Sequence, residues 1–383
     1  MEIKDRFFQA PQGSFFIFGP RGTGKTTWLN QNFKNALLID FLSPESFRMY
    51  SAKPERLEEL VHGNPDKKIV IIDEIQKVPE LLDVVHQLIE KRKDLRFILT
   101  GSSSRKLKRS GVDLLAGRIL LRTFHPFMAA ELGSSFNLNQ SLQFGLLPLV
   151  LASDNPEDVL KSYASLYLRE EVQMEGLVRN IGNFSRFLEA ISFSHGNVLN
   201  TSEIARECHV ERKTVEGYIS ILEDLLLSFR LPVFSKRAKR NLTTHPKFYF
   251  FDAGVFKSIR PAGPLDSPQE IGGGALEGLI AQHLRAWNAY SGDKHKIYFW
   301  RTKSGNEVDF IVYGPKELWA IETKNSKSIH HKEFSGLLAF KQDYPETQPL
   351  LVYRGKEKIK IKGILCVPCE EFLKNLLPGK ALV

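Results

Sequence analysis

The sequence has too few cysteines for a disulfide framework. Cys208, Cys366 and Cys369 are the three cysteines among 383 residues, and so small a number agrees with a reducing compartment. Cys366 and Cys369 form a C-x-x-C motif, but a structural zinc site needs four ligands and the sequence offers no second pair. We therefore interpret these two residues as small apolar side chains at the end of a buried strand.

Long apolar runs are also missing. No stretch approaches the ~18 apolar residues that a membrane span needs, and the first residues lack the pattern of a secretory signal. We therefore expect a cytoplasmic protein with no membrane partner. Acidic residues are fewer than basic ones: the sequence has 53 Lys and Arg and 44 Asp and Glu, which gives a net charge of +9. This balance favours an acidic partner such as nucleic acid.

The composition is that of a globular chain with several domains. Hydrophobic residues make up 42% and charged residues 25% of the sequence, which excludes a disordered or fibrous protein. At ~100–200 residues per domain, the length leaves room for about two to four domains.

The hydrophobic pattern divides the chain into four parts. Residues 1–130 alternate helical stretches with short runs that are apolar on both faces, as the strands of a parallel sheet covered by helices are. Residues 131–185 have helical spacing and predict a lid or connector. Residues 186–262 have the element order of a winged helix-turn-helix. Residues 263–383 combine a helix with three apolar strands.

A glycine-rich motif follows the first predicted strand and opens a helix. The segment from Gly19 to Thr26 fits G-x-x-x-x-G-K-[ST] in the context that a phosphate-binding loop requires. Backbone amides and the helix N-terminus would bind phosphates, Lys25 would reach the β and γ phosphates, and the Thr26 hydroxyl would hold magnesium. We expect ATP and magnesium here. The predicted nucleotide-binding residues are Gly19, Pro20, Arg21, Gly22, Thr23, Gly24, Lys25, Thr26, Thr27 and Ser102.

Two further predicted strands end in polar residues. Asp73 and Glu74 follow an apolar strand at the edge where open α/β sheets place their ligands. Asp73 would hold magnesium through water and Glu74 would polarise the attacking water, whereas the alternative is a solvated carboxylate pair. After the next strand, Thr100 and Ser102 are candidates for sensing the γ phosphate, and a plain serine-rich turn is the alternative.

These motifs resemble those of the AAA+ ATPases, and more narrowly those of a prokaryotic family of predicted AAA+ ATPases. The matching segments are Gly19–Thr26, Ile72–Gln76, Leu99–Ser103, Leu115–Arg118 and Tyr167–Arg169. The resemblance implies ATP hydrolysis and a homo-oligomer, with a hexamer as the family expectation and a monomer or dimer as the alternative. It also implies an arginine from a neighbouring subunit at the nucleotide. Arg118 and Arg169 are the candidates, and a structural ion pair is an equal alternative for each.

Basic residues mark the predicted helix-turn-helix at two places. One pair lies at the exposed start of the second helix, the part of a recognition helix that meets base edges. Four more lie in the loop between the next two strands, where a wing would touch a phosphate backbone. The alternatives are a solvated charged hairpin and a protein-interaction module. The residues predicted to contact DNA are Arg212, Lys213, Lys236, Arg237, Lys239 and Arg240.

Acidic residues gather in the C-terminal part. Asp309 lies on one predicted strand and Glu322 and Lys324 on the next, with the last two on one face by the period of two. Two carboxylates joined by a hairpin, with a lysine beside them, can hold magnesium and orient a water against a phosphodiester. Glu277 on the preceding helix would complete the metal shell. The spacing alone is a modest indication, because such charges are common on ordinary strands.

The family resemblance extends to this part. The matching segments are Phe248–Gly254, Gly273–Glu277, Tyr298–Phe310 and Ala320–Lys324. They look like a module of unknown function that follows the AAA+ core and is itself similar to PD-(D/E)xK nucleases. The resemblance implies a restriction-endonuclease-like α/β fold and puts Glu277, Asp309, Glu322 and Lys324 on the nuclease positions. Cleavage does not follow, because that fold also serves for binding.

The sequence therefore predicts an α/β protein with a P-loop AAA+ core, a helical lid, a winged helix-turn-helix and a nuclease-like C-terminal domain. Our first hypothesis is an ATPase that couples ATP hydrolysis to binding or remodelling of DNA. Its predicted catalytic residues are Lys25, Asp73, Glu74 and Arg118. Magnesium-dependent cleavage at the C-terminal module is a further possibility. The alternative is a nucleotide-dependent switch that docks on a protein partner, with the nuclease-like module as an inert platform.

Overall fold

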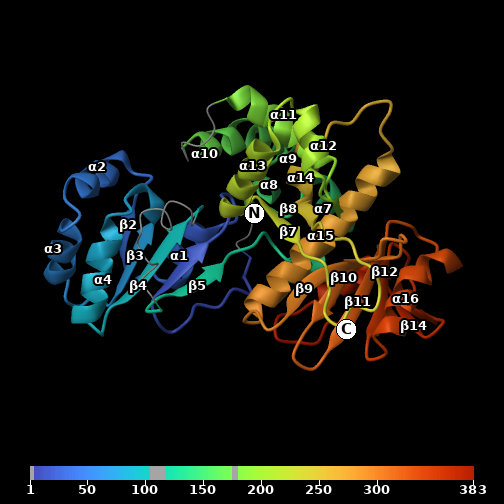
Figure 1. Ribbon diagram of the computed structural model, residues 1–383. Helices are drawn as coiled ribbons and strands as arrows, with labels where there is room; N and C mark the ends of the chain where they lie inside the picture. Colours follow the sequence, from blue (N-terminus) through green and yellow to red (C-terminus); the bar gives the residue numbers. More distant parts are fainter. Residues whose placement is uncertain (1–3, 104–116, 175–179) are drawn as a thin grey trace. The chain divides into compact units, whose positions relative to one another are not determined.

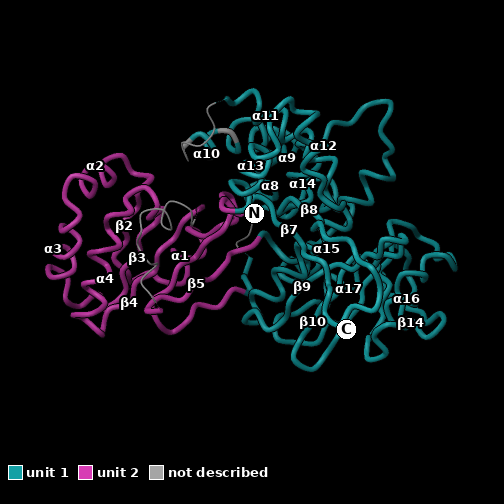
Figure 2. The backbone as a smooth tube through the Cα atoms, viewed as in Figure 1, with its two compact units in different colours: residues 1–7, 126–223, 227–383 teal, residues 8–125, 224–226 magenta. Residues whose placement is uncertain are grey.

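The computed structural model describes residues 4–103, 117–174 and 180–383, and these form two compact units (Figure 1). The smaller unit contains the described residues between 8 and 125 together with 224–226, and the larger unit contains the rest (Figure 2). Among the described residues, no helix combines the length and apolar character that crossing a membrane would require.

The smaller unit is built on a five-stranded sheet in the order β2-β3-β4-β1-β5, in which all pairings are parallel. The strands are β1 (Phe15–Phe18), β2 (Leu37–Asp40), β3 (Ile69–Asp73), β4 (Arg96–Gly101) and β5 (Leu120–Thr123). The three inner strands are almost entirely buried, which explains why their sequences are continuously apolar. The predicted parallel sheet is confirmed.

In the described residues of this unit, four α-helices accompany the sheet: α1 (Lys25–Asn32), α2 (Pro44–Ala52), α3 (Arg56–Gly63) and α4 (Leu81–Lys91). Leu57 and Val61 of α3 and Val85 and Leu88 of α4 belong to the same buried core as the sheet residue Ile72. Because β4 lies between β1 and β3, the carboxyl ends of these three strands are neighbours at one edge.

The larger unit begins with short helices. They are α6 (Ala129–Leu132), α7 (Leu138–Phe144), α8 (Pro148–Leu151), α9 (Pro156–Ser162), α10 (Leu168–Met174) and α11 (Ile181–Ser192), with a π-helical turn at Tyr163–Tyr167. Asn137, Asn155 and Asn180 cap α7, α9 and α11 by accepting a hydrogen bond from a backbone N–H three residues on, which is why the helices start there. The helical spacing of this part is thus reflected in the structure.

A buried aspartate joins this helical part to α14 (Ala253–Ile259). Asp252 accepts hydrogen bonds from the backbone N–H of Gly254 at 2.9 Å and of Leu146 at 2.8 Å. Gly145, with φ +71°, passes so close that a Cβ there would clash with the Asp252 carboxylate. Burial raises the pKa of Asp252 to about 6 in spite of the N–H donors that lower it. Part of the segment that resembled the nuclease-like module therefore has a packing role.

Two further helices lie in the chain between the first strand and the other two strands of a small antiparallel sheet in the order β6-β8-β7. These elements are α12 (Thr201–Glu207), α13 (Arg212–Asp224), β6 (Asn197–Val198), β7 (Ser228–Leu231) and β8 (Lys247–Phe250). The buried face of α13 contains Val215, Tyr218, Ile219 and Leu222 at helical spacing. The N-terminal residues of α13 stay exposed.

The C-terminal part is a six-stranded mixed sheet in the order β13-β14-β12-β11-β10-β9. Its elements are α15 (Pro268–Tyr290), β9 (Lys296–Arg301), β10 (Glu307–Tyr313), β11 (Leu318–Lys324), α16 (Ser335–Asp343), β12 (Gln348–Tyr353), β13 (Ile359–Ile361), β14 (Ile364–Pro368) and α17 (Cys369–Asn375). The sheet contains β12, β13 and β14 in addition to the three strands predicted from apolar runs, and β14 is the buried strand that was expected to end at Cys366 and Cys369. Cys366 and Cys369 are buried free thiols, which confirms their interpretation as small apolar residues.

The loop between β7 and β8 lies along the edge of this sheet. Val233 forms a bridge with Phe299 of β9, and Leu242 forms one with Thr302. Phe234 belongs to the buried core of the C-terminal sheet. The segment predicted as a wing is therefore packed on the C-terminal part of the same unit.

Candidate functional site

The loop between β1 and α1 owes its shape to its glycines. Gly22 and Gly24 have φ of +81° and +90°, a conformation that side chains rarely adopt. A Cβ on Gly19 would clash with the carbonyl oxygen of Phe124. The Thr23 hydroxyl donates to the carbonyl oxygen of Pro20 at 2.8 Å and closes the loop. The result is a tight turn that leads into the N-terminus of α1.

Lys25, the first residue of α1, is only 6% exposed. Its ammonium donates to the carbonyl oxygens of Gly19 at 2.7 Å and Pro20 at 3.3 Å. The buried ammonium thus binds two carbonyl oxygens of the loop. Phosphate oxygens would be stronger partners for it, because hydrogen bonds between ionised groups are stronger than those to neutral oxygens.

Asp73, at the end of β3, connects the start of α1 with the end of β4. Its Oδ2 atom accepts from the Thr26 hydroxyl at 2.7 Å, and its Oδ1 atom accepts from the Thr100 hydroxyl. Asp73 is 1% exposed. The hydroxyl and carboxylate oxygens of Thr26 and Asp73 are the hard ligands that magnesium prefers, so these residues fit the predicted metal.

Glu74 has a strained backbone, with φ +59°. Its N–H donates to the Thr100 hydroxyl at 3.1 Å, and its carboxylate accepts from Gln76 Nε2, which also donates to Ser102 Oγ at 3.0 Å. A non-glycine residue in this conformation costs ~1–3 kcal/mol and is concentrated at active sites. Gln76, quoted in the sequence only as part of a motif, thus links the ends of β3 and β4.

Arg118 forms an ion pair with Glu90 of α4. The hydrogen bond from Arg118 lowers the pKa of Glu90. Both side chains are more than 40% exposed, so the pair is weak and leaves the guanidinium accessible. The side chain of Arg169, the other predicted arginine, lies outside the described residues, as do Leu115 and Ala116.

The comparisons with known proteins agree with this geometry. Residues 12–133 match a family model described as an AAA domain. This segment is an AAA+ ATPase-like domain. Two models described as domains of unknown function match residues 135–266 and 272–372, so the matches to the rest of the chain name no activity.

Relatives along most of the chain are described as uncharacterized proteins. One from Mycobacterium tuberculosis is 26% identical over 370 residues, which covers 93% of this chain and 80% of the relative. One from Haemophilus influenzae is 22% identical and covers 91% of each chain. Among solved structures, AMPPCP-bound DnaA from Aquifex aeolicus matches 55% of this chain and 81% of its own, with 14% identity and a TM-score of 0.26. So low a TM-score says nothing about function.

In the larger unit, a buried lysine forms ion pairs with three acidic side chains. Lys247, at the start of β8, is 1% exposed. Its ammonium lies 2.9 Å from Glu277 Oε1, 2.5 Å from Glu307 Oε1 and 3.3 Å from Asp309 Oδ1. We call Lys247 and these three carboxylates the lysine cluster. It brings together α15, β8 and β10.

Neutral donors complete the lysine cluster. The Tyr249 hydroxyl donates to Glu277 Oε1 at 2.6 Å. The backbone N–H and the hydroxyl of Thr323 donate to Asp309 Oδ2 at 2.8 and 2.9 Å. Buried carboxylates are stabilised by such donors when water cannot reach them.

Glu322 and Lys324 form a second pair beside the lysine cluster. Lys324 Nζ lies 2.5 Å from Glu322 Oε1, whereas Glu322 Oε2 is buried and accepts no hydrogen bond from any described residue. Phe310 pairs with Ile321 across β10 and β11, which puts Asp309 and Glu322 at opposed positions of the antiparallel pair. The four predicted nuclease-like residues therefore lie in one region of the unit.

Burial and mutual repulsion hold these carboxyls partly protonated. Burial first, and then the charge of Asp309, raise the pKa of Glu277 to about 7 and that of Glu322 to about 8. Burial also opposes ionisation of Asp309, but Lys247 and Lys324 outweigh it and lower its pKa. Asp309 is thus the ionised member of the group at neutral pH.

Lys247 fills the position between Glu277 and Asp309. In the part of the chain that the structure describes, no three His, Cys, Asp or Glu side chains are arranged to hold a metal ion. A metal held by all three predicted carboxylates does not fit this arrangement, although the unpaired Glu322 oxygen is a suitable single ligand. Binding of magnesium by Asp309 and Glu322 stays a prediction.

The sequence did not single out Lys247, Tyr249 or Glu307. The signal was present as two residues spaced by two on each of two strands, Lys247 with Tyr249 and Glu307 with Asp309. Such spacing puts both side chains on one face of a strand, but it does not say that the two strands approach each other.

The basic residues predicted to contact DNA fall into two groups. Arg212 pairs with Glu216 at 2.9 Å, Arg240 pairs with Asp343 at 2.7 Å, and Lys236 lies 4.5 Å from the centre of the Tyr313 ring. The remaining three, at the start of α13 and in the loop before β8, are exposed and make no ion pair with any described residue. They are Lys213, Arg237 and Lys239.

We expect Lys247→Met to destabilise the larger unit by about 3–5 kcal/mol, because it leaves buried carboxylates without their cation. Chemical denaturation followed by circular dichroism measures the change. Lys316→Met is the matched control, since Lys316 is exposed in the β10–β11 turn, and it should change stability by less than ~0.5 kcal/mol. Equal stability of the two variants would contradict a structural role for the lysine cluster.

The unfolding free energy should fall as pH rises from about 4.5 to about 8. Within this window Glu277 and Glu322 bind more protons in the folded protein than in the unfolded chain, because folding raises their pKa values from 4.5. Denaturant midpoints measured across this pH range test the slope. Glu322→Gln should flatten it, whereas Glu370→Gln, an exposed carboxyl on α17, should leave it unchanged.

Proposed function

We propose that the protein hydrolyses ATP with magnesium at the loop between β1 and α1 and couples this turnover to binding or remodelling of DNA. The observation that carries the ATPase half is the hydrogen bond from Thr26, at the start of α1, to Asp73 at the end of β3, with Lys25 and Glu74 adjacent to them in the chain. These are the groups that position phosphates, metal and water for phosphoryl transfer.

Each group has a distinct task in this proposal. Lys25 exchanges its carbonyl partners for phosphate oxygens and neutralises charge that develops during transfer. Thr26 and Asp73 hold magnesium, which supplies further neutralising charge. Glu74 orients and polarises the attacking water. Its hydrogen bond from Gln76 keeps the carboxylate in place until the water arrives.

Thr100 and Ser102 are suited to report on the γ phosphate. The Thr100 hydroxyl contacts both Asp73 and the Glu74 backbone, and Ser102 shares Gln76 with the Glu74 carboxylate. A shift of either hydroxyl toward a phosphate oxygen would therefore alter the position of the catalytic carboxylate. In a homo-oligomer, Arg118 would supply a further cation to a neighbour's nucleotide once Glu90 releases it.

The nucleic-acid half of the proposal is supported by charge and by element order. The chain has a net charge of +9, and Lys213, Arg237 and Lys239 are exposed. The succession of α11, α12, α13, β7 and β8 is that of a winged helix-turn-helix, whose second helix meets DNA with its N-terminal residues. In the nuclease-like region, the ion pairs of Lys247 with Glu277 and Asp309 occupy two of the predicted metal ligands, which disfavours cleavage.

One observation favours a second candidate, a nucleotide switch that docks on a protein partner. The lysine cluster satisfies its own carboxylates and presents no set of three metal ligands. A C-terminal module of this kind is suited to an inert platform. Both candidates share the ATP site and differ in whether DNA changes the turnover.

We expect Glu74→Gln to lower ATP turnover by about 100-fold or more while nucleotide binding is retained, because general-base assistance contributes about 10²–10⁴. Lys25→Ala should abolish binding as well. Phosphate release and fluorescent-nucleotide titration measure the two effects. Glu80→Gln, at an exposed carboxyl nearby in sequence, is the control. Unchanged turnover in Glu74→Gln would exclude its assigned role.

ATP turnover should rise when branched or linear duplex DNA is added. The combined variant Lys213→Ala, Arg237→Ala and Lys239→Ala should lose this stimulation, keep the basal rate and bind DNA with a smaller dependence on salt. Alanine at Lys316, Lys332 and Lys374 gives a charge-matched control. A turnover rate that no DNA alters would favour the protein-docking switch.

A further inference from the structure

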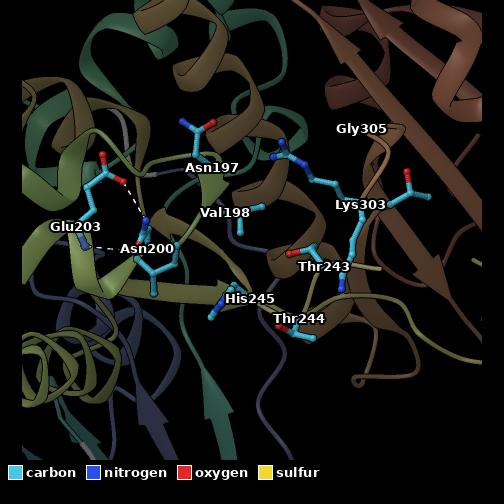
Figure 3. A pocket seen from close by; sticks show the side chains of 12 residues that line it. Asn197, Val198, Asn200, Glu203, Thr243, Thr244, His245, Lys303 and Gly305 are labelled. Carbon is cyan, nitrogen blue, oxygen red and sulfur yellow. Dashed lines mark hydrogen bonds between the residues drawn. The ribbon is translucent and has the colours of Figure 1, made fainter. Parts of the chain in front are cut away.

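A cavity of about 860 Å³ opens in the larger unit beside the β9–β10 turn. In Figure 3, Asn197, Asn200 and Glu203 line one side, Lys303 and Gly305 the other, and Thr243, Thr244 and His245 lie between them. The walls therefore come from the start of α12, the segment before β8 and the turn of the C-terminal sheet. This volume is within the range of ligand sites.

The cavity wall is basic. Arg301, Lys303 and His245 are among its lining residues, and Glu203 is the single acidic one. The Glu203 carboxylate already accepts from the Asn200 side chain at 3.1 Å. No described residue forms an ion pair with Lys303, so its ammonium is available to an anion.

The uncharged lining residues indicate which part of a nucleic acid fits. The hydroxyls of Thr243 and Thr244 can donate to phosphate oxygens. None of the lining residues is Phe, Tyr or Trp, whereas sites that bind bases of single strands use such rings for stacking. The cavity is therefore suited to a sugar–phosphate backbone.

A chain of charged contacts leads from the cavity to the lysine cluster. Arg301 Nη1 lies 3.4 Å from Glu307 Oε2, and Glu307 Oε1 lies 2.5 Å from Lys247 Nζ. Asn197 also lines a second cavity, of about 160 Å³, whose wall includes Glu277. An anion in the large cavity would thus lie next to the acidic region.

We propose that this cavity binds consecutive phosphates of one nucleic-acid strand and guides the strand toward Glu277, Asp309 and Glu322. Lys303 and Arg301 would contact the phosphates, and the threonine hydroxyls would fix their positions. The inference rests on the nucleic-acid half of the proposed function. It adds a binding surface that is separate from α13 and from the basic residues Arg237 and Lys239.

Fluorescence anisotropy tests whether the cavity binds a nucleic-acid strand. The probe is a labelled single-stranded oligonucleotide bound to the full chain, and the competitors are an unlabelled mononucleotide and inorganic phosphate. Lys303→Ala should weaken oligonucleotide binding about tenfold and lower the slope of log affinity against log salt by about 0.7–1. Lys316→Ala, in the turn at the other end of β10, should change neither. Thr243→Val supplies a second variant that removes a donor at constant charge and should also weaken binding.

The outcomes separate this inference from the proposed function. If the oligonucleotide binds and both Lys303→Ala and Thr243→Val bind as the unaltered protein does, the cavity proposal is wrong and the DNA-coupled ATPase stands. If phosphate or the mononucleotide competes as well as an unlabelled oligonucleotide at equal phosphate concentration, the cavity takes a small anion and the strand proposal is overturned. If no nucleic acid binds at all, both proposals fail.

Discussion

A single buried ammonium organises the larger unit. Lys247 can be buried only because Glu277, Glu307 and Asp309 surround it, since an isolated charge in such a place would cost several kcal/mol. These partners belong to α15 and β10, whereas Lys247 belongs to β8 of the small sheet β6-β8-β7. Packing of the small sheet against the C-terminal sheet is therefore a condition for accommodating the charge, and the two parts form one compact unit.

The same constraint fixes the loop between β7 and β8 at both ends. Lys247 holds its end, and Phe234 anchors its beginning in the C-terminal core. Arg240 is tied to Asp343 in between. A wing in the usual sense projects from its domain, but here its basic residues belong to a surface shared with the C-terminal sheet. Any nucleic acid that touches Arg237 or Lys239 would therefore meet both parts together.

The sequence predicted the parallel sheet and the glycine-rich loop of the smaller unit well and the larger unit only in part, for a physical reason. The shape of the loop from Gly19 to Lys25 depends on residues that are neighbours in the chain, because positive φ angles and the start of a helix are local properties. Strand β3 could be predicted because its own residues form a short run that is apolar on both faces. The lysine cluster depends on which strands approach each other. Lys247 lies 30 residues before Glu277 and 62 before Asp309, and no local pattern records that approach. Strand β12 was missed as well, since its short run lacks a distinctive motif.

The two acidic regions differ in how their charge is balanced. The Asp73 carboxylate accepts hydrogen bonds from two hydroxyls. A divalent cation can therefore bind this carboxylate without displacing another cation. Lys247 Nζ lies 3.3 Å from Asp309 Oδ1, so a metal ion at Asp309 must compete with this ammonium. The ammonium belongs to the chain and loses no translational entropy on binding, whereas a metal ion does. The free oxygen of Glu322 could ligate a metal only weakly by itself. Cleavage would therefore require Lys247 to move, and because Lys247 also holds the two sheets together, such a movement would involve the whole larger unit.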